Sequence, residues 1–204
     1  MTERSDVELM LAFRAGDDGA FSVLVQRHKD AVMNLTYRYL GNRADAEDLA
    51  QEVFLRVYRA RKGYRPDAKF STWLYRVAVN ACLNEVRSRK SRPTHRAAAL
   101  NAGDGEIGAA LPDARNEAPP EAAAREELRA AVRNAVDALP ERQRLALLLN
   151  KFHGLGYQEM AGALDLSVPA VKSLLVRARE SVRRAIEPYL RAGEADVAAR
   201  KGEA

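Results

Sequence analysis

Apolar residues recur at helical spacing through two long parts of the chain. Between Ala20 and Arg92 three amphipathic runs follow one another, and the same spacing returns at Leu128 and persists to about Leu190. A period near 3.6 residues is typical of helices that bury one face. No segment alternates apolar and polar residues as a half-buried strand does. The pattern therefore predicts an all-α fold, with a helical bundle in the first part.

Breaks between the runs agree with this interpretation. Gly41 and Asn42 end the first helix, and Asp45 opens the second. Ser71 or Thr72 is expected to cap the third helix.

Residues 93–125 have a different texture. They contain half of the chain's eight prolines, many alanines and glycines, and no aromatic residue, which is typical of a flexible linker. The chain is thus expected to form two small helical domains, 1–92 and 126–190, joined by this linker. The last residues, 191–204, are expected to be a disordered tail.

Composition adds a basic character to this picture. The chain carries 33 lysines and arginines against 28 carboxylates, with a net charge of +5 and an isoelectric point near 9.5. A balance rich in arginine favours contact with phosphates or base edges, although charge alone fits a merely basic soluble protein equally well.

The cellular compartment follows from cysteine content and apolar runs. Cys82 is the only cysteine, so the chain can form neither an internal disulfide nor a thiolate zinc site, which fits a reducing compartment. Charges interrupt the short apolar run at the N-terminus, unlike the core of a signal peptide, and no stretch approaches a membrane span. We expect a cytoplasmic protein without membrane insertion.

Motifs for catalysis or cofactor binding lack their structural setting. GDGEIG at 103–108 fits the glycine fingerprint of a dinucleotide site, but no predicted strand precedes it and Pro112 soon follows. His28, His95 and His153 lie in separate segments, without partners at metal-ligand spacing. We therefore predict no enzymatic activity, no cofactor and no metal site.

The segment YQEMAGALDLSVPAVKSLLVRARESVRR, residues 157–184, has the pattern of a helix-turn-helix motif. A short helix with Met160 and Leu164 inward precedes a turn at Asp165, and Ser167 is expected to cap the second helix. Val171 and its apolar partners then form the buried side of that helix.

The opposite side of the second helix suits a DNA groove. Arginine can grip guanine edges or phosphates, and serine can contact either. A solvated face on an ordinary core helix is the alternative. The residues predicted to face DNA are Ser167, Pro169, Ala170, Lys172, Ser173, Val176, Arg177 and Arg179.

A second polar stripe lies on the third predicted helix. Arg76, Asn80, Asn84 and Arg87 fall within about 80 degrees of arc. Aromatic residues near the start of this helix can stack on exposed bases, although Phe70 and Trp73 are residue types found more often in a core. The nucleic-acid ligands predicted in this region are Lys62, Tyr64, Lys69, Arg76, Asn80, Asn84, Arg87, Arg89 and Lys90.

Three segments, taken in order along the chain, resemble the extracytoplasmic-function sigma factors of the sigma-70 family. They are DAEDLAQEVFLRVYRA at 45–60, FSTWLYRVAVNACLNEVRSRK at 70–90 and the segment from LPERQRLALLLNKFHGLGYQEM onward. The resemblance implies a transcription initiation factor whose segment like 45–60 docks on a coiled coil of the largest subunit of core RNA polymerase. The carboxylates at the start of segment 45–60 and the arginines toward its end also complement the helix dipole, which is an alternative or additional reason for their placement. The implied docking residues are Asp45, Glu47, Asp48, Leu49, Glu52 and Phe54.

The resemblance also implies how promoter DNA is used. Residues 60–92 would recognise and help melt the minus-ten element, with a flipped base received by the loop from Arg61 to Lys69. The helix-turn-helix would enter the major groove near minus thirty-five, and an anti-sigma protein would hold the chain inactive. Gly156, Asp165 and Leu174 depart from common family residues, and Leu174 puts one expected phosphate contact in doubt.

Two other functions compete with this interpretation. A conventional helix-turn-helix regulator would bind specific DNA by itself, using only the C-terminal motif. A pure interaction module would occupy polymerase without reading DNA, and the polar stripe of the third helix argues against it.

Overall fold

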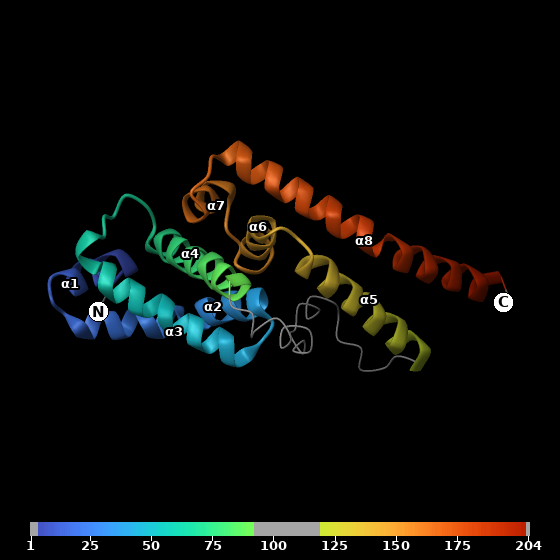
Figure 1. The fold of residues 1–204 in the computed structure, drawn as a ribbon, viewed down its shortest axis with the longest axis horizontal. Coiled ribbons are helices and arrows are strands. Elements are labelled where there is room, and N and C mark those ends of the chain that lie inside the picture. Colours follow the sequence, from blue (N-terminus) through green and yellow to red (C-terminus); the bar gives the residue numbers. More distant parts are fainter. Residues whose placement is uncertain (1–3, 92–118, 203–204) are drawn as a thin grey trace.

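The protein is described by a computed structural model, which covers residues 4–91 and 119–202 (Figure 1). The GDGEIG segment and residues 93–118 of the expected linker lie outside this range. Within it the secondary structure is helical, without a strand, so the predicted all-α fold is confirmed. The helices are α1 (Asp6–Arg14), α2 (Asp18–Leu40), α3 (Arg43–Ala60), η1 (Arg61–Gly63), α4 (Phe70–Ser91), α5 (Pro119–Asp137), α6 (Glu141–Phe152), α7 (Tyr157–Leu164) and α8 (Val168–Gly202).

Local sequence signals set the ends of the helices in the N-terminal half. Asp17 caps α2 by accepting from the backbone N–H of Ala20, and Gly41 ends α2 in the left-handed conformation at φ 74°. Asn42, expected only to end the preceding helix, also caps α3. The expected cap of the third helix was wrong, because α4 begins at Phe70 and Thr72 is buried in its first turn.

The C-terminal half differs from expectation at both ends. Helix α5 begins at Pro119, inside the range expected to be linker, and α8 continues to Gly202 through the expected disordered tail. Alanine, glutamate and arginine dominate both segments, and these residues have high helix propensity. In the part of the chain that the structure describes, no helix is both long and apolar enough to cross a membrane.

The turn between α7 and α8 has the expected helix-turn-helix chemistry. Asp165 adopts the left-handed conformation at φ 54°, which few residues other than glycine, asparagine and aspartate tolerate. Glu159 accepts a hydrogen bond from the backbone N–H of Gly156 and thereby closes the start of α7. The Ser167 hydroxyl accepts from the N–H of Ala170 in the first turn of α8.

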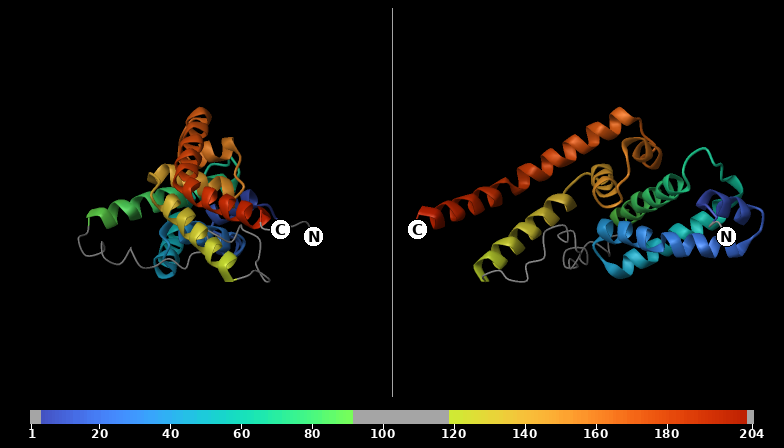
Figure 2. Two further views of the ribbon diagram at one scale, coloured as in Figure 1. Left: turned by 90° about the vertical axis from the view of Figure 1, so that its right-hand side faces the viewer. Right: turned by 180° about the vertical axis from the view of Figure 1, so that it is seen from behind.

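The two halves pack against each other, which the sequence did not predict. Helix α7 lies on α4 and helix α6 lies on α2, an arrangement visible from both sides of the molecule (Figures 1 and 2). Leu35 of α2 and Leu148 of α6 belong to one continuous cluster of buried side chains. The expected pair of helical units therefore shares a core.

Asp6 ties α1 to α2 and should make stability depend on pH. Its carboxylate lies 2.8 Å from Arg27 and 2.7 Å from His28. Burial alone would raise the pKa of Asp6, but hydrogen bonds from these two residues outweigh it and hold the pKa below its ordinary value. A lowered folded pKa means stability that is complete above the unfolded value and is lost as pH falls through the folded value.

We therefore predict that Asp6→Asn reduces the free energy of unfolding at neutral pH. The difference from wild type should disappear as pH falls below about 4. Urea unfolding at a series of pH values measures both quantities. A deficit that is constant down to pH 2 would contradict the proposed electrostatic origin.

The left-handed turn gives a second prediction. Asp165→Val should lower the free energy of unfolding by about 1–2 kcal/mol, since a β-branched residue is strained at positive φ. Asp165→Gly is the control and should be at least as stable as wild type. Thermal unfolding of both variants measures the difference, and equal losses for the two would contradict the conformational reason.

Candidate protein-docking and nucleic-acid interfaces

Most of the predicted docking residues surround a groove between α3 and α4. The groove has a volume of about 430 Å³. Helix α3 contributes Asp45, Asp48 and Glu52 to its wall, and α4 contributes Asn84 and Arg89. Asp48 is exposed and has no ion-pair partner among the residues that the structure describes. Its carboxylate is thus available to a cationic partner.

The apolar members of the predicted docking set lie deeper. Leu49 is only 6% exposed and belongs to the core, whereas Phe54 is half-buried. Leu55, which the sequence prediction missed, is 50% exposed. It follows Asp48 and Glu52 on the same side of α3, opposite the buried stripe. An apolar residue opposite the core stripe was the available signal.

Ion pairs within the chain occupy several of the predicted charges. Asp45 is bonded to Arg89 of α4 at 2.8 Å, and Arg89 also bonds Glu85 at 2.8 Å. Arg89, predicted as a nucleic-acid ligand, instead joins α4 to the acidic end of α3. Glu47 pairs with Arg43 one turn away.

The polar stripe of α4 is placed as predicted. Arg76, Asn80, Asn84 and Arg87 are all exposed along one side of the helix. Lys62 and Lys69 are exposed near its start, and the side chain of Lys90 lies outside the described residues. The stripe therefore offers donors and acceptors to an extended polar ligand.

Tyr64, by contrast, is wrongly placed by the sequence prediction. Its side chain is 1% exposed and packs edge-on against Trp73 at 5.1 Å between ring centroids. Its backbone carbonyl accepts from Arg14, which fixes the loop to α1. Tyr64 thus shapes the loop from within and cannot stack on a base in this state.

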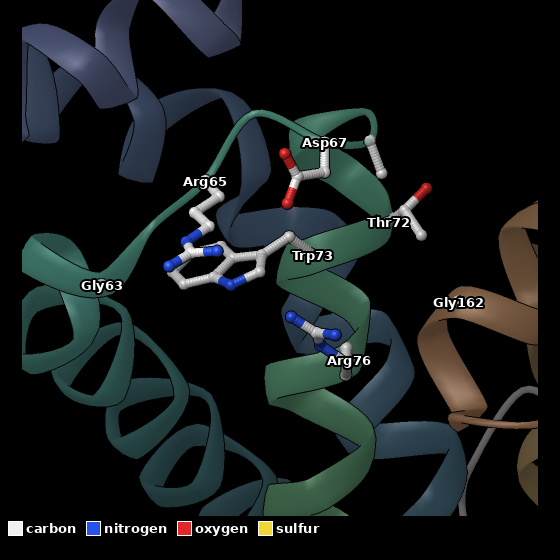
Figure 3. Close-up of a pocket in the computed structure, with 8 residues that line it drawn as sticks. Gly63, Arg65, Asp67, Thr72, Trp73, Arg76 and Gly162 are labelled. Carbon is white, nitrogen blue, oxygen red and sulfur yellow. The ribbon is translucent and has the colours of Figure 1, made fainter.

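A pocket opens where this loop meets α4. It measures about 210 Å³, and its walls include Arg65 and Asp67 of the loop with Trp73 and Arg76 of α4 (Figure 3). Gly162 of α7 also lines the pocket, and Thr72 points toward it. An aromatic ring beside hydrogen-bonding groups suits a planar polar ligand.

The second helix of the helix-turn-helix has the expected two sides. Val171, Leu175 and Ala178 are buried. Val176 is 64% exposed, an unusual place for an apolar side chain unless it meets a partner. The other exposed residues of the predicted DNA-facing set are Ser167, Pro169, Lys172, Ser173, Arg177 and Arg179, with Ala170 half-buried.

Two charged residues on this helix have partners within the chain. Arg179 donates to Asn150 of α6 at 2.9 Å, so it braces the motif in addition to any outward role. Glu180 pairs with Arg183 and Arg184 at 3.3 and 3.9 Å. These pairs offset the negative charge on an otherwise basic surface.

Neither metal binding nor thiol chemistry is apparent in the described part of the chain. No group of histidine, cysteine and carboxylate side chains is placed there to hold a metal ion. Cys82 is fully buried, and burial raises the pKa of its thiol to about 12. A thiol with so high a pKa is a poor nucleophile at neutral pH.

Comparison with known proteins places both halves in one family. Residues 24–92 match Sigma-70 region 2, and residues 129–182 match Sigma-70, region 4. RNA polymerase sigma-H factor of Pseudomonas aeruginosa is 36% identical over 94% of this chain and 98% of its own length. ECF RNA polymerase sigma-E factor of Escherichia coli is 37% identical over 92% of this chain and 97% of its own length.

Solved structures agree on the fold. CnrH, in complex with the cytosolic domain of CnrY, matches with a TM-score of 0.65 at 25% identity and covers 91% of this chain and 99% of that one. The sigma factor RpoE of Bartonella quintana, in complex with the anti-sigma factor NepR, matches with a TM-score of 0.59 at 17% identity, over 82% of this chain and 96% of that one. Because both sigma-70 regions occur in order and the similarity spans nearly the whole chain, this protein belongs to the extracytoplasmic-function sigma factors of the sigma-70 family, which are transcription initiation factors and not enzymes.

Proposed function

We propose that this sigma factor divides its work among three exposed surfaces, of α3, α4 and α8. The observation that carries the proposal is the exposure of three chemically different stripes on one helical framework. The first is acidic with an exposed leucine at its C-terminal end, the second is rich in amides and arginines, and the third is basic with an exposed valine. One partner with a single chemistry would not need all three.

The α3 surface is assigned to core RNA polymerase. Asp48 and Glu52 would meet cationic side chains of the largest-subunit coiled coil, and Leu55, one turn after Glu52, would supply apolar contact. An exposed leucine beside carboxylates fits an interface that combines apolar and polar contacts. Leu49, being buried, supports this surface from beneath.

The α4 surface is assigned to the non-template strand of the minus-ten element. Asn80, Asn84 and Arg87 lie in line along α4, and the pocket beside Trp73 and Arg76 has the size and chemistry for a flipped base. Stacking and phosphate contacts there would offset the few kcal/mol lost when a base leaves the duplex.

The α8 surface is assigned to the major groove near minus thirty-five. Arg177 would contact a guanine edge or phosphate, and Val176 would meet a thymine methyl. We further infer control by an anti-sigma protein, because the structural relatives CnrH and RpoE were solved with bound partners, RpoE with an anti-sigma factor. A cytoplasmic location follows from the position of polymerase itself.

The proposal is tested by mixing the purified chain with bacterial core RNA polymerase and a pool of promoter fragments. A stable complex that starts transcripts at a shared motif is the expected result. Specific DNA binding without a polymerase complex would favour the conventional regulator instead.

Charge reversal on α3 tests the assignment of that surface to polymerase. Replacing Asp48 and Glu52 with lysine should weaken the binding of core polymerase at least tenfold, since like charges at an interface cost several kcal/mol. Asp30→Lys, which makes the same charge change as either single replacement at an exposed position of α2, is the control for Asp48→Lys and Glu52→Lys taken singly. Unchanged affinity with intact circular dichroism would remove α3 from the docking surface.

Truncation of the Arg177 side chain tests the assignment of α8 to DNA. Arg177→Ala should weaken holoenzyme binding to its promoter by about 1–3 kcal/mol and relax base preference at one position. Arg191→Ala, the same charge change four turns further along α8, should leave base preference unaltered. Competition binding against a library of minus-thirty-five sequences measures both, and an unchanged preference for Arg177→Ala would exclude a base contact.

A further inference from the structure

Helix α1 precedes the part of the chain that matches Sigma-70 region 2. That match begins at residue 24, whereas α1 spans Asp6–Arg14, so the family assignment gives this helix no role. The helix is nevertheless firmly held. Its carboxylate Asp6 bonds Arg27 and His28 of α2, and its apolar side, which includes Phe13, is buried. Helix α1 is therefore a fixed point from which a neighbouring segment can be positioned.

The last residue of α1 reaches the loop that follows η1. Nη1 of Arg14 donates to the backbone carbonyl of Tyr64 at 3.0 Å. The residues on either side of Tyr64 are Gly63 and Arg65, and both line the pocket beside Trp73 (Figure 3). Because peptide units are planar and rigid, fixing one carbonyl restricts the backbone on both sides of it. The bond from Arg14 thus constrains the wall of the pocket.

Helix α1 also contacts the turn that precedes this loop. The guanidinium of Arg61, the first residue of η1, lies 5.3 Å from the ring centroid of Phe13 and 4.3 Å from that of Tyr58. A cation over an aromatic face is attracted by the charge distribution of the ring. Phe13 in turn stacks on Phe21 of α2, with 4.6 Å between ring centroids. Helix α1 therefore holds both the turn and the loop.

The bond from Arg14 is suited to setting the geometry of the loop more than its stability. Arg14 is exposed, so water can reach the Tyr64 carbonyl when the guanidinium is removed, and the cost to folding is small. The ring of Tyr64 is anchored independently, because it packs edge-on against Phe70 and Trp73. Without Arg14 the ring would stay buried, while the peptide that joins Tyr64 to Arg65 would be free to rotate.

We propose that Arg14 is a positioning residue for capture of the flipped base, and that α1 holds the loop from Arg61 to Lys69 in the shape that receives this base. This inference rests on the proposed function of α4. A pocket whose walls are already ordered binds without the cost of ordering them. The bond from Arg14 is therefore expressed as affinity for the flipped base. A direct phosphate contact would instead weaken the binding of all sequences uniformly.

Abasic oligonucleotides test the proposal. Holoenzyme assembled from the full chain and bacterial core RNA polymerase is titrated, by fluorescence anisotropy, with single-stranded DNA that carries the non-template minus-ten motif of a promoter it initiates. One strand is intact, and the others each lack one base, which locates the flipped base as the position where wild type loses most affinity. Arg14→Ala should bind the intact strand about tenfold more weakly than wild type. The strand that lacks the flipped base should be bound equally by both.

Two further variants serve as controls. Arg14→Lys keeps a charged donor on a long side chain and should retain most of the affinity for the intact strand. Arg4→Ala removes the same charge from the same end of the chain, where the side chain pairs with exposed Asp17, and should behave as wild type. Affinity for core polymerase should be unchanged in all three variants, which shows that each is folded.

The outcomes separate this inference from the function on which it rests. Equal affinity of Arg14→Ala and wild type for the intact strand would overturn the positioning role. An equal weakening on intact and abasic strands would overturn it too, because that is the result expected of a phosphate contact. If wild type forms no polymerase complex, or loses affinity at no single abasic position, the proposed function itself is wrong.

Initiation from the promoter pool gives a second measurement. Holoenzyme with Arg14→Ala should show a relaxed base preference at the flipped position and an unaltered preference in the minus-thirty-five element, since α8 does not contact α1. Sequencing of the transcribed fragments measures both preferences. An unchanged preference at the flipped position would contradict the positioning role.

Discussion

The approach of α7 to α4 at Gly162 is the constraint on which the arrangement of the two halves depends. Without a Cβ atom at this position, the helix axes come close enough for Thr72 to be buried and for Lys69 to reach Glu159. The same approach carries His153 to Tyr75. Burial and the positive charge of Arg38 lower the pKa of His153 to about 4, so this bond is made by a neutral imidazole at physiological pH.

Charges in this protein fall into those used within the chain and those left for partners. Arg89 and Arg179 are used internally, by Asp45 and Asn150 respectively. Asp48 and Arg177 remain exposed on the outer sides of their helices. Exposed ion pairs contribute at most about 1 kcal/mol, so the internal pairs orient the helices more than they stabilise them.

Much of the candidate site was predictable because helical faces follow from the sequence alone. The period of 3.6 residues placed Val171 inward and Arg177 outward, and placed Arg76, Asn80 and Asn84 on one stripe. Tyr64 was misplaced and Leu55 was missed, for different reasons. A loop residue has no period to report whether it is buried, and an apolar residue opposite the core stripe looks like noise until its exposure is known.

The sequence by itself determined the helices, the turn at Asp165, the family and the polar stripes, since caps, periodicity and left-handed tolerance are local properties of the chain. Only the tertiary structure decided that α7 lies on α4 and that Arg89 pairs with Asp45 of α3. Contacts between residues far apart in sequence depend on shape complementarity at single positions such as Gly162. No local pattern encodes that complementarity, because it is a property of two surfaces and not of one.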